Sequence, residues 1–147
     1  MVNVVTSYHD IDKLSPLTDS LLEKFPEITS LVNNVNTRKA DVAFGEYETL
    51  LYGKPFIKEK LGDLTFEISA NSFFQTNTTQ GEVLYKEVED ALELEGNEII
   101  YDLYCGTGTI GLSLSQTAKH VYGFEIIRSS LENAQINATK NLSLIHI

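Results

Sequence analysis

A glycine-rich turn between two apolar runs constrains the fold of this chain more than any other feature. Residues 99–102 (Ile-Ile-Tyr-Asp) predict a buried strand that ends in an acid. Gly106 and Gly108 follow in a tight loop, and a second apolar run from Ile110 predicts a helix. Glycines let a backbone pass close beneath a ligand, and a new helix offers free N–H groups. The stretch therefore predicts the first half of a nucleotide-binding βαβ unit.

A second strand is expected at residues 120–124, and Glu125 follows it directly. Glu125 comes 19 positions after Gly106, close to the spacing of about 20 at which such folds bind ribose hydroxyls. The glycines at 106, 108 and 111 also match the dinucleotide fingerprint. An NAD-dependent dehydrogenase is therefore an alternative, although a lone match of this kind is weak.

Asp102 favours a different cofactor from NAD. A carboxylate at the end of the first strand would face a cofactor pyrophosphate at close range, and the like charges would repel each other strongly in a partly dry cleft. S-adenosylmethionine has no phosphate, and its cationic amino group and sulfonium suit an acidic rim. The charges therefore favour a methyl donor as the ligand.

Three blocks of sequence carry a family resemblance. They are residues 71–77 (Asn-Ser-Phe-Phe-Gln-Thr-Asn), 102–109 (Asp-Leu-Tyr-Cys-Gly-Thr-Gly-Thr) and 121–125 (Val-Tyr-Gly-Phe-Glu). In this order and spacing they resemble the RumA/TrmA family of RNA (uracil-5-)-methyltransferases, nearest to the bacterial forms that act on 23S rRNA. The resemblance covers about the whole chain up to Asn141.

The resemblance implies an α/β fold and an incomplete protein. Residues 1–70 are expected to form a small central α+β subdomain. Residues 71–147 are expected to be the front half of a Rossmann-like, S-adenosylmethionine-dependent methyltransferase domain. Residues 142–147 (Leu-Ser-Leu-Ile-His-Ile) match the translation of a common transposase-end sequencing adapter, so we expect them to be artefactual. A genuine third strand is the alternative.

The resemblance also assigns cofactor-binding roles to five residues. Gln75 is expected to reach the cofactor, and Tyr104 to lie beside its methionine part. Gly106 provides the close backbone approach, and Thr109 fills a contact position that is Asn in some members. Glu125 is expected to accept hydrogen bonds from both ribose hydroxyls.

Cys105 is not expected to be a nucleophile. In the resembled family a thiolate adds to uracil C6, C5 takes the methyl group, and a base then removes the C5 proton. That thiolate must face the base from the side opposite the methyl donor, whereas Cys105 lies in the turn beneath the cofactor. A thiol there is a small packing residue. No catalytic residue is expected in this chain, which alone should be inactive.

Charge and composition limit the partners. A net charge of −10 argues against a bare RNA-binding module, because phosphate contacts need Lys and Arg. The partner that the resemblance implies is RNA, most simply 23S rRNA, and we expect it to bind the longer parent. No apolar run approaches the roughly 20 residues of a membrane span. A single cysteine fits a reducing compartment. We expect a cytoplasmic monomer that binds neither DNA nor metal.

Two further functions remain open. The first is a methyltransferase for another substrate that shares the same front half, and the second is a non-catalytic module that binds the cofactor or RNA.

Hydrophobic periodicity predicts the remaining elements. The helix near residues 78–94 is expected to bury its apolar side chains, and Pro16 and Pro26 are expected to divide the region 10–34 into two helices. The expected strands are residues 2–6, a hairpin of 41–45 and 48–52, and 64–69; a last helix is expected at 128–141.

Overall fold

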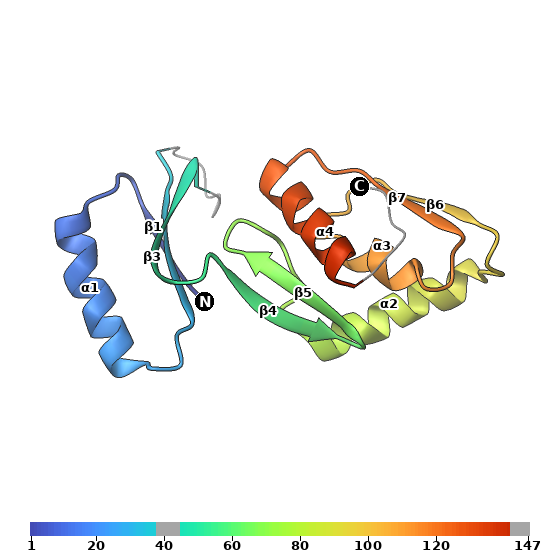
Figure 1. The fold of residues 1–147 in the computed structure, drawn as a ribbon, viewed down its shortest axis with the longest axis horizontal. Helices are drawn as coiled ribbons and strands as arrows, with labels where there is room; N and C mark the ends of the chain where they lie inside the picture. The colour runs from blue at the N-terminus through green and yellow to red at the C-terminus, as the bar shows by residue number, and fades with distance from the viewer. Residues whose placement is uncertain (38–44, 142–147) are drawn as a thin grey trace. The chain divides into compact units, whose positions relative to one another are not determined.

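A computed structural model describes residues 1–37 and 45–141 of the chain. The chain forms two compact units, Met1–Ile57 and Lys58–Ile147, which are described separately (Figure 1). The boundary expected after residue 70 falls inside the second unit. Residues 142–147, whose origin we questioned from the sequence, lie outside the described residues.

The first unit is a three-stranded sheet with one helix. Strand β1 (Val2–Thr6) is followed by helix α1 (Ile11–Lys24), strand β2 (Ser30–Val35) and strand β3 (Tyr47–Gly53). The strand order is β1-β2-β3, with β1 parallel and β3 antiparallel to β2. Every residue of the central strand β2 is buried, so this strand forms the middle of the unit's core.

The helical prediction for residues 10–34 is wrong over its second half. Helix α1 is a single helix that contains Pro16, and Asp10 caps it by accepting a hydrogen bond from the Lys13 amide at 3.3 Å. It ends at Lys24, and Ser30–Val35 is a strand. Residues 30–35 form a strand because they pair with β1, and this pairing outweighs the helical spacing of their apolar side chains.

The hairpin predicted from residues 41–45 and 48–52 is described only in part. Its second strand is present in β3, which pairs with β2. Residues 41–44 lie outside the described part of the chain.

The second unit contains a hairpin followed by a parallel strand pair with three helices. Strands β4 (Phe56–Leu61), which begins just before the unit boundary, and β5 (Leu64–Ser69) form a two-stranded sheet. Strand β4 is not among the strands predicted from the sequence. The elements that follow are α2 (Thr78–Leu92), β6 (Ile99–Asp102), α3 (Thr109–Leu114), β7 (His120–Gly123) and α4 (Arg128–Lys140).

Strands β6 and β7 are parallel, in a register that runs from Ile99 opposite His120 to Asp102 opposite Gly123. This confirms the predicted βαβ unit, with α3 as its connecting helix. One face of the pair is packed, since Val121 is fully buried. On the opposite face the rings of Tyr101 and Tyr122 stack with centroids 5.5 Å apart, and the residue Tyr101 is 60% exposed.

The predicted buried face of α2 is wrong. Val83 and Leu84 are each about half exposed, whereas Gly81 and Tyr85 are the buried residues of this helix. The side chain of Asn77 caps α2 by accepting from the Gln80 amide at 3.1 Å. Within the part of the chain that the structure describes, no helix has the length and apolar character needed to cross a membrane.

Candidate functional site

The glycine-rich turn is held between the ends of β6 and β7. The Cys105 amide donates to the Phe124 carbonyl at 3.0 Å, and the Phe124 amide donates to the Asp102 carbonyl at 2.8 Å. The Gly108 amide closes the turn by donating to the Cys105 carbonyl at 2.7 Å. The turn is therefore an extension of the parallel pair, and it opens at the carboxyl ends of both strands, where α/β sheets bind ligands.

The two glycines of the turn meet different surroundings. Both have positive φ, +54° at Gly106 and +84° at Gly108, which side chains disfavour. A Cβ on Gly106 would meet nothing within 4 Å, so open space lies above this residue. A Cβ on Gly108 would lie 3.4 Å from the Cβ of Ala134 in α4. Gly106 therefore faces the space where a ligand fits, while Gly108 packs on a helix.

Glu125 joins the turn to the start of α4. One carboxylate oxygen, Oε2, accepts from the Gly106 amide at 3.0 Å. The other, Oε1, accepts from the Ile126 and Ile127 amides at 2.8 Å. The carboxylate thus lies at the mouth of the turn, where a ligand above Gly106 would meet it.

Asp102 presents a buried carboxylate oxygen to the same region. The backbone N–H groups of Tyr104 and Gly111 lie near its carboxylate and act to lower the pKa of the Asp102 carboxyl. Its Oδ2 is buried and has no hydrogen-bond partner within residues 1–37 and 45–141. Burial is the main cause that raises the pKa of the Asp102 carboxyl, and the nearby charge of Glu125 adds to it. A cationic group would satisfy this oxygen, whereas a phosphate would be repelled.

Of the remaining predicted residues, Tyr104 and Thr109 flank the two glycines in sequence, and Gln75 lies against α2. Tyr104 is 90% exposed at the start of the turn. Thr109 begins α3, and its hydroxyl accepts from the Tyr85 hydroxyl at 3.2 Å, which ties α3 to α2. Gln75 precedes α2, and its Cβ lies 3.4 Å from the place of a Cβ on Gly81. The structure therefore joins Gly106 directly to Glu125, and the cofactor roles of Gln75, Tyr104 and Thr109 stay predictions.

Cys105 has the environment of a packing residue. Its side chain is buried, and burial, reinforced by the charges of Asp102 and Glu125, raises the pKa of the thiol to about 11. The thiol is therefore protonated at neutral pH, and a protonated thiol is a poor nucleophile.

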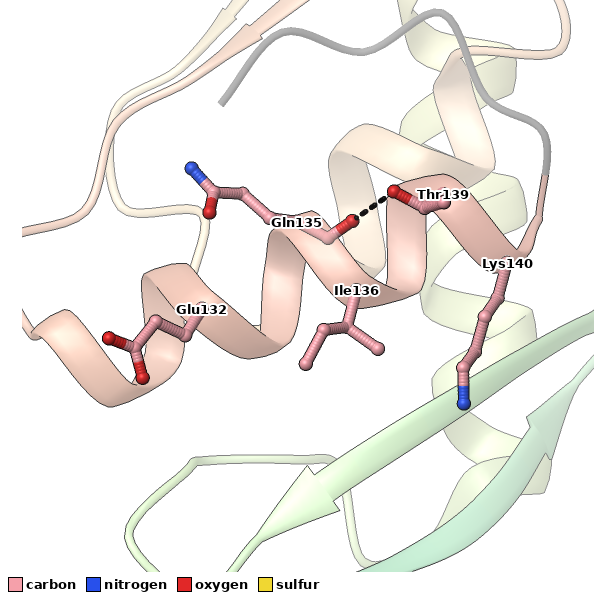
Figure 2. A pocket seen from close by; sticks show the side chains of 5 residues that line it. All are labelled: Glu132, Gln135, Ile136, Thr139 and Lys140. Atoms are coloured by element: carbon pink, nitrogen blue, oxygen red, sulfur yellow. Dashed lines mark hydrogen bonds between the residues drawn. The ribbon is translucent and has the colours of Figure 1, made fainter.

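A separate depression of about 510 Å³ lies on the outer side of α4 (Figure 2). All of its described lining residues come from that helix, and the Lys140 side chain at its end forms an ion pair with Glu67 of β5. This depression is distinct from the turn. Within the described ranges no group of three or more His, Cys, Asp or Glu side chains could hold a metal ion.

Sequence reasoning missed the contribution of α4 to the site. Asn137 is fully buried and donates a hydrogen bond to the carbonyl of Thr107, inside the turn, at 3.1 Å. The available signal was the spacing of Asn133, Asn137 and Asn141, which lie four residues apart on one helix face.

A parallel βαβ unit with a glycine-rich turn and an acid after its second strand defines the class of the second unit: a Rossmann-like domain of the kind found in S-adenosylmethionine-dependent methyltransferases. The family follows from sequence. The family model described as tRNA (uracil-5-)-methyltransferase matches residues 19–147, and the chain belongs to this family.

Known proteins similar to this chain are much longer than it. An uncharacterized RNA methyltransferase of Enterococcus faecalis is 45% identical over 141 residues, which is 96% of this chain and 31% of that protein. An uncharacterized RNA methyltransferase of Chlorobaculum tepidum is 46% identical over 142 residues, 96% of this chain and 29% of that protein. The chain thus spans about a third of the length of the curated relatives it matches.

A solved structure has the same arrangement. The tRNA (uracil-54, C5)-methyltransferase of Pyrococcus abyssi, in complex with S-adenosyl-L-homocysteine, matches with a TM-score of 0.75 at 31% identity. The match covers 97% of this chain and 33% of that protein.

Proposed function

We propose that this chain binds S-adenosylmethionine at the turn of residues 103–108, as the cofactor-binding front half of an RNA (uracil-5-)-methyltransferase. The observation that carries the proposal is the carboxylate of Glu125, held 3.0 Å from the Gly106 amide beside open space. A carboxylate after the second strand is the group that binds a ribose diol in folds of this kind.

The residues present fit the cofactor. Gly106 leaves room for it, and Glu125 accepts from its ribose hydroxyls. The charge of Asp102, whose Oδ2 is buried and unpartnered, attracts the cationic amino group of the cofactor. Tyr104, exposed at the start of the turn, covers the methionine part, and Gln75 and Thr109 add further contacts.

The chain orients a methyl donor and supplies no nucleophile. S-adenosylmethionine, when bound, provides an electrophilic methyl group on its sulfonium. The sequence contains one cysteine, Cys105, which is buried and protonated. We propose that the thiolate and the proton acceptor for uracil methylation belong to other residues of the parent enzyme, and that this chain alone is inactive.

The RNA substrate is proposed at two levels of detail. RNA is supported by the family and by the relatives named above. The narrower proposal is 23S rRNA, supported by the resemblance of residues 71–77 and 102–109 to bacterial rRNA enzymes. Transfer RNA is the competing substrate, since the family description and the Pyrococcus abyssi protein both name tRNA. We also propose that the parent is a cytoplasmic monomer.

Calorimetric titration of the full chain tests cofactor binding. S-adenosylhomocysteine is expected to bind the wild type, while NAD at the same concentration gives no heat. Glu125→Ala is expected to lower the affinity for S-adenosylhomocysteine by about 100-fold, because two charge-assisted hydrogen bonds are lost. Glu132→Ala is the matched control, because Glu132 is an exposed acid of α4 that pairs with Arg128.

Three results contradict the proposal: no S-adenosylhomocysteine binding by the folded wild type, tighter binding of NAD, or unchanged affinity in Glu125→Ala. The substrate is tested on the parent enzyme with radiolabelled S-adenosylmethionine and separate 23S rRNA and tRNA transcripts. Methylation of tRNA alone overturns the narrower proposal, and methylation of neither RNA favours a methyltransferase for another substrate.

A further inference from the structure

Three asparagines of α4 and its C-cap bind β5 in place of a neighbouring strand. Asn141 accepts from the Thr65 amide at 3.0 Å and donates to the Thr65 carbonyl at 2.9 Å. Asn137 accepts from the Glu67 amide at 2.7 Å and donates to the Glu67 carbonyl at 3.2 Å. Asn133 donates to the Ser69 hydroxyl at 2.9 Å. The side-chain amides of Asn141 and Asn137 thus satisfy the backbone groups of alternate residues along this edge of β5, Thr65 and Glu67.

The spacing of the asparagines along α4 matches that of alternate residues along β5. Four residues of an α-helix rise about 6.0 Å, and two residues of a strand rise about 6.6 Å. Amides at every fourth helical position therefore meet alternate residues of a strand that runs alongside. Helix α4 lies beside β5 in this way (Figures 1 and 2). Lys140 adds an ion pair to Glu67.

Asn137 alone among the three continues into the glycine-rich turn. Its second N–H donates to the Thr107 carbonyl at 3.1 Å, so that both N–H donors and the oxygen of its amide are engaged. Asn137 and Thr107 are both buried, and Ala134, one turn earlier, packs beneath Gly108. The turn therefore rests on α4 at two adjacent residues.

We infer that Asn137 is a positioning residue for the cofactor turn: its amide fixes the Thr107 peptide to β5 and thereby sets the position of the Gly106 and Gly108 backbone. Glu125 binds both the Gly106 amide and the amides of Ile126 and Ile127, which lead directly into α4. The acid and the turn are therefore both connected to this helix. The functional consequence, cofactor affinity, rests on the function proposed above.

Asn141 provides a matched control. It makes the same two-point contact with the backbone of β5 as Asn137, but its remaining N–H donates to the Asn137 carbonyl of its own helix and not to the turn. Asn137→Ala and Asn141→Ala both remove a contact with β5. Only Asn137→Ala removes the contact with the turn.

The test is amide hydrogen exchange of the ligand-free full chain, followed by NMR. Gly106 and Gly108 donate their amides within the site, and Gly81 of α2, a buried residue whose amide donates to the Asn77 carbonyl at 2.9 Å, serves as the internal reference. We expect Asn137→Ala to speed exchange at both glycines about fivefold or more relative to Gly81, the effect of one lost hydrogen bond. Asn141→Ala is expected to leave this ratio unchanged.

Affinity for S-adenosylhomocysteine is the second readout. At a temperature where all variants are folded, Asn137→Ala is expected to bind at least about fivefold more weakly than Asn141→Ala. If Asn137→Ala does not fold, Asn137→Leu replaces it, because Leu keeps the branched shape of Asn, lacks N–H donors and introduces no buried charge.

Equal exchange ratios in the Asn137 and Asn141 variants overturn the assignment, and so do equal affinities. A wild-type chain that fails to bind S-adenosylhomocysteine contradicts the proposed function instead. The exchange comparison then still decides the role of Asn137, because it uses no ligand.

Discussion

The amide of Gly106 and the carboxylate of Glu125 are joined by a hydrogen bond of 3.0 Å across 19 positions of sequence. Two oxygens of a carboxylate offer about four acceptor positions. Glu125 uses three of them for the amides of Gly106, Ile126 and Ile127. A ribose diol brings two donors, so binding it requires the Gly106 contact to lengthen or to be shared.

Replacing the Glu125 carboxylate by an amide tests this arrangement. In Glu125→Gln one oxygen is able to serve Ile126 and Ile127, but the NH₂ group then faces the Gly106 N–H, and two donors oppose each other. We expect the free energy of unfolding to fall by about 1–3 kcal/mol, measured by urea denaturation. Glu132→Gln, on the exposed side of α4, is the control and should change it by less than about 0.5 kcal/mol. Equal stability of the wild type and Glu125→Gln would contradict the role of this contact.

A comparison of Gly106 with Gly62 separates two effects of a Gly→Ala substitution: backbone strain, and loss of the space that a ligand would occupy. Their φ angles are +54° and +57°, and a Cβ on either would meet nothing within 4 Å. Gly62 lies in the β4–β5 turn, away from the site. Gly106→Ala and Gly62→Ala should each lower the free energy of unfolding by about 1–2 kcal/mol. Only Gly106→Ala should lower the affinity for S-adenosylhomocysteine, by about tenfold or more, since the methyl group of the new alanine enters the open space. Calorimetry on both variants decides this, and an equal affinity would exclude close approach at Gly106.

Cys105 should be an inert thiol in the folded chain. A pKa of about 11 leaves about one thiol in 10,000 ionised at neutral pH. Labelling with a disulfide reagent at pH 7 is expected to be at least about 100-fold slower in the native chain than in urea. Cys105→Ala should keep the affinity for S-adenosylhomocysteine within about threefold. Rapid native labelling would show an accessible thiolate and reopen a catalytic role for this residue.

The parts of the fold that were predictable are those encoded in contiguous residues. The strand before Gly106, the turn and the second strand before Glu125 follow each other along the chain, so periodicity and glycine spacing were sufficient. Strand β2 was missed because its partner β1 is distant in sequence, and pairing overrode a helical spacing of apolar residues. The exposed Val83 and Leu84 were placed inside because periodicity reports an apolar face and not what covers it.

In the site, too, residues that belong to a local pattern were predicted and those that depend on distant partners were not. Glu125 was found from a spacing, whereas Asn137 was not, because its partner Glu67 lies 70 positions away and is a backbone group with no side-chain signature. Buried asparagines usually bond to backbone, and the partner of such a residue depends on the tertiary fold. Positioning residues of this kind are therefore harder to predict from sequence than residues that touch a ligand.

Asp102 should link cofactor binding to pH. Burial, aided by the charge of Glu125, raises the pKa of its carboxyl in the folded chain above the ordinary value of 3.8. The folded state therefore holds this proton more tightly than the unfolded state does. The resulting stability is fully present below the ordinary pKa and is lost as the pH rises through the raised one. Asp102→Asn does not titrate, so the difference between its melting temperature and that of the wild type should shift in favour of Asp102→Asn as the pH rises above the ordinary carboxyl pKa of 3.8.

Asp102→Asn should lower the affinity for S-adenosylhomocysteine while it stabilises the folded chain at neutral pH. Without the carboxylate the cationic amino group of S-adenosylhomocysteine loses its charged partner, and affinity at neutral pH should fall by about tenfold or more. Asp90→Asn, an exposed acid of α2, is the control for loss of one negative charge and should change neither quantity appreciably. Parallel melting curves and titrations of the three proteins test both effects. If Asp102→Asn became less stable relative to the wild type as the pH rises, the carboxylate would be stabilising when charged, and its proposed role toward a cationic ligand would lose its physical basis.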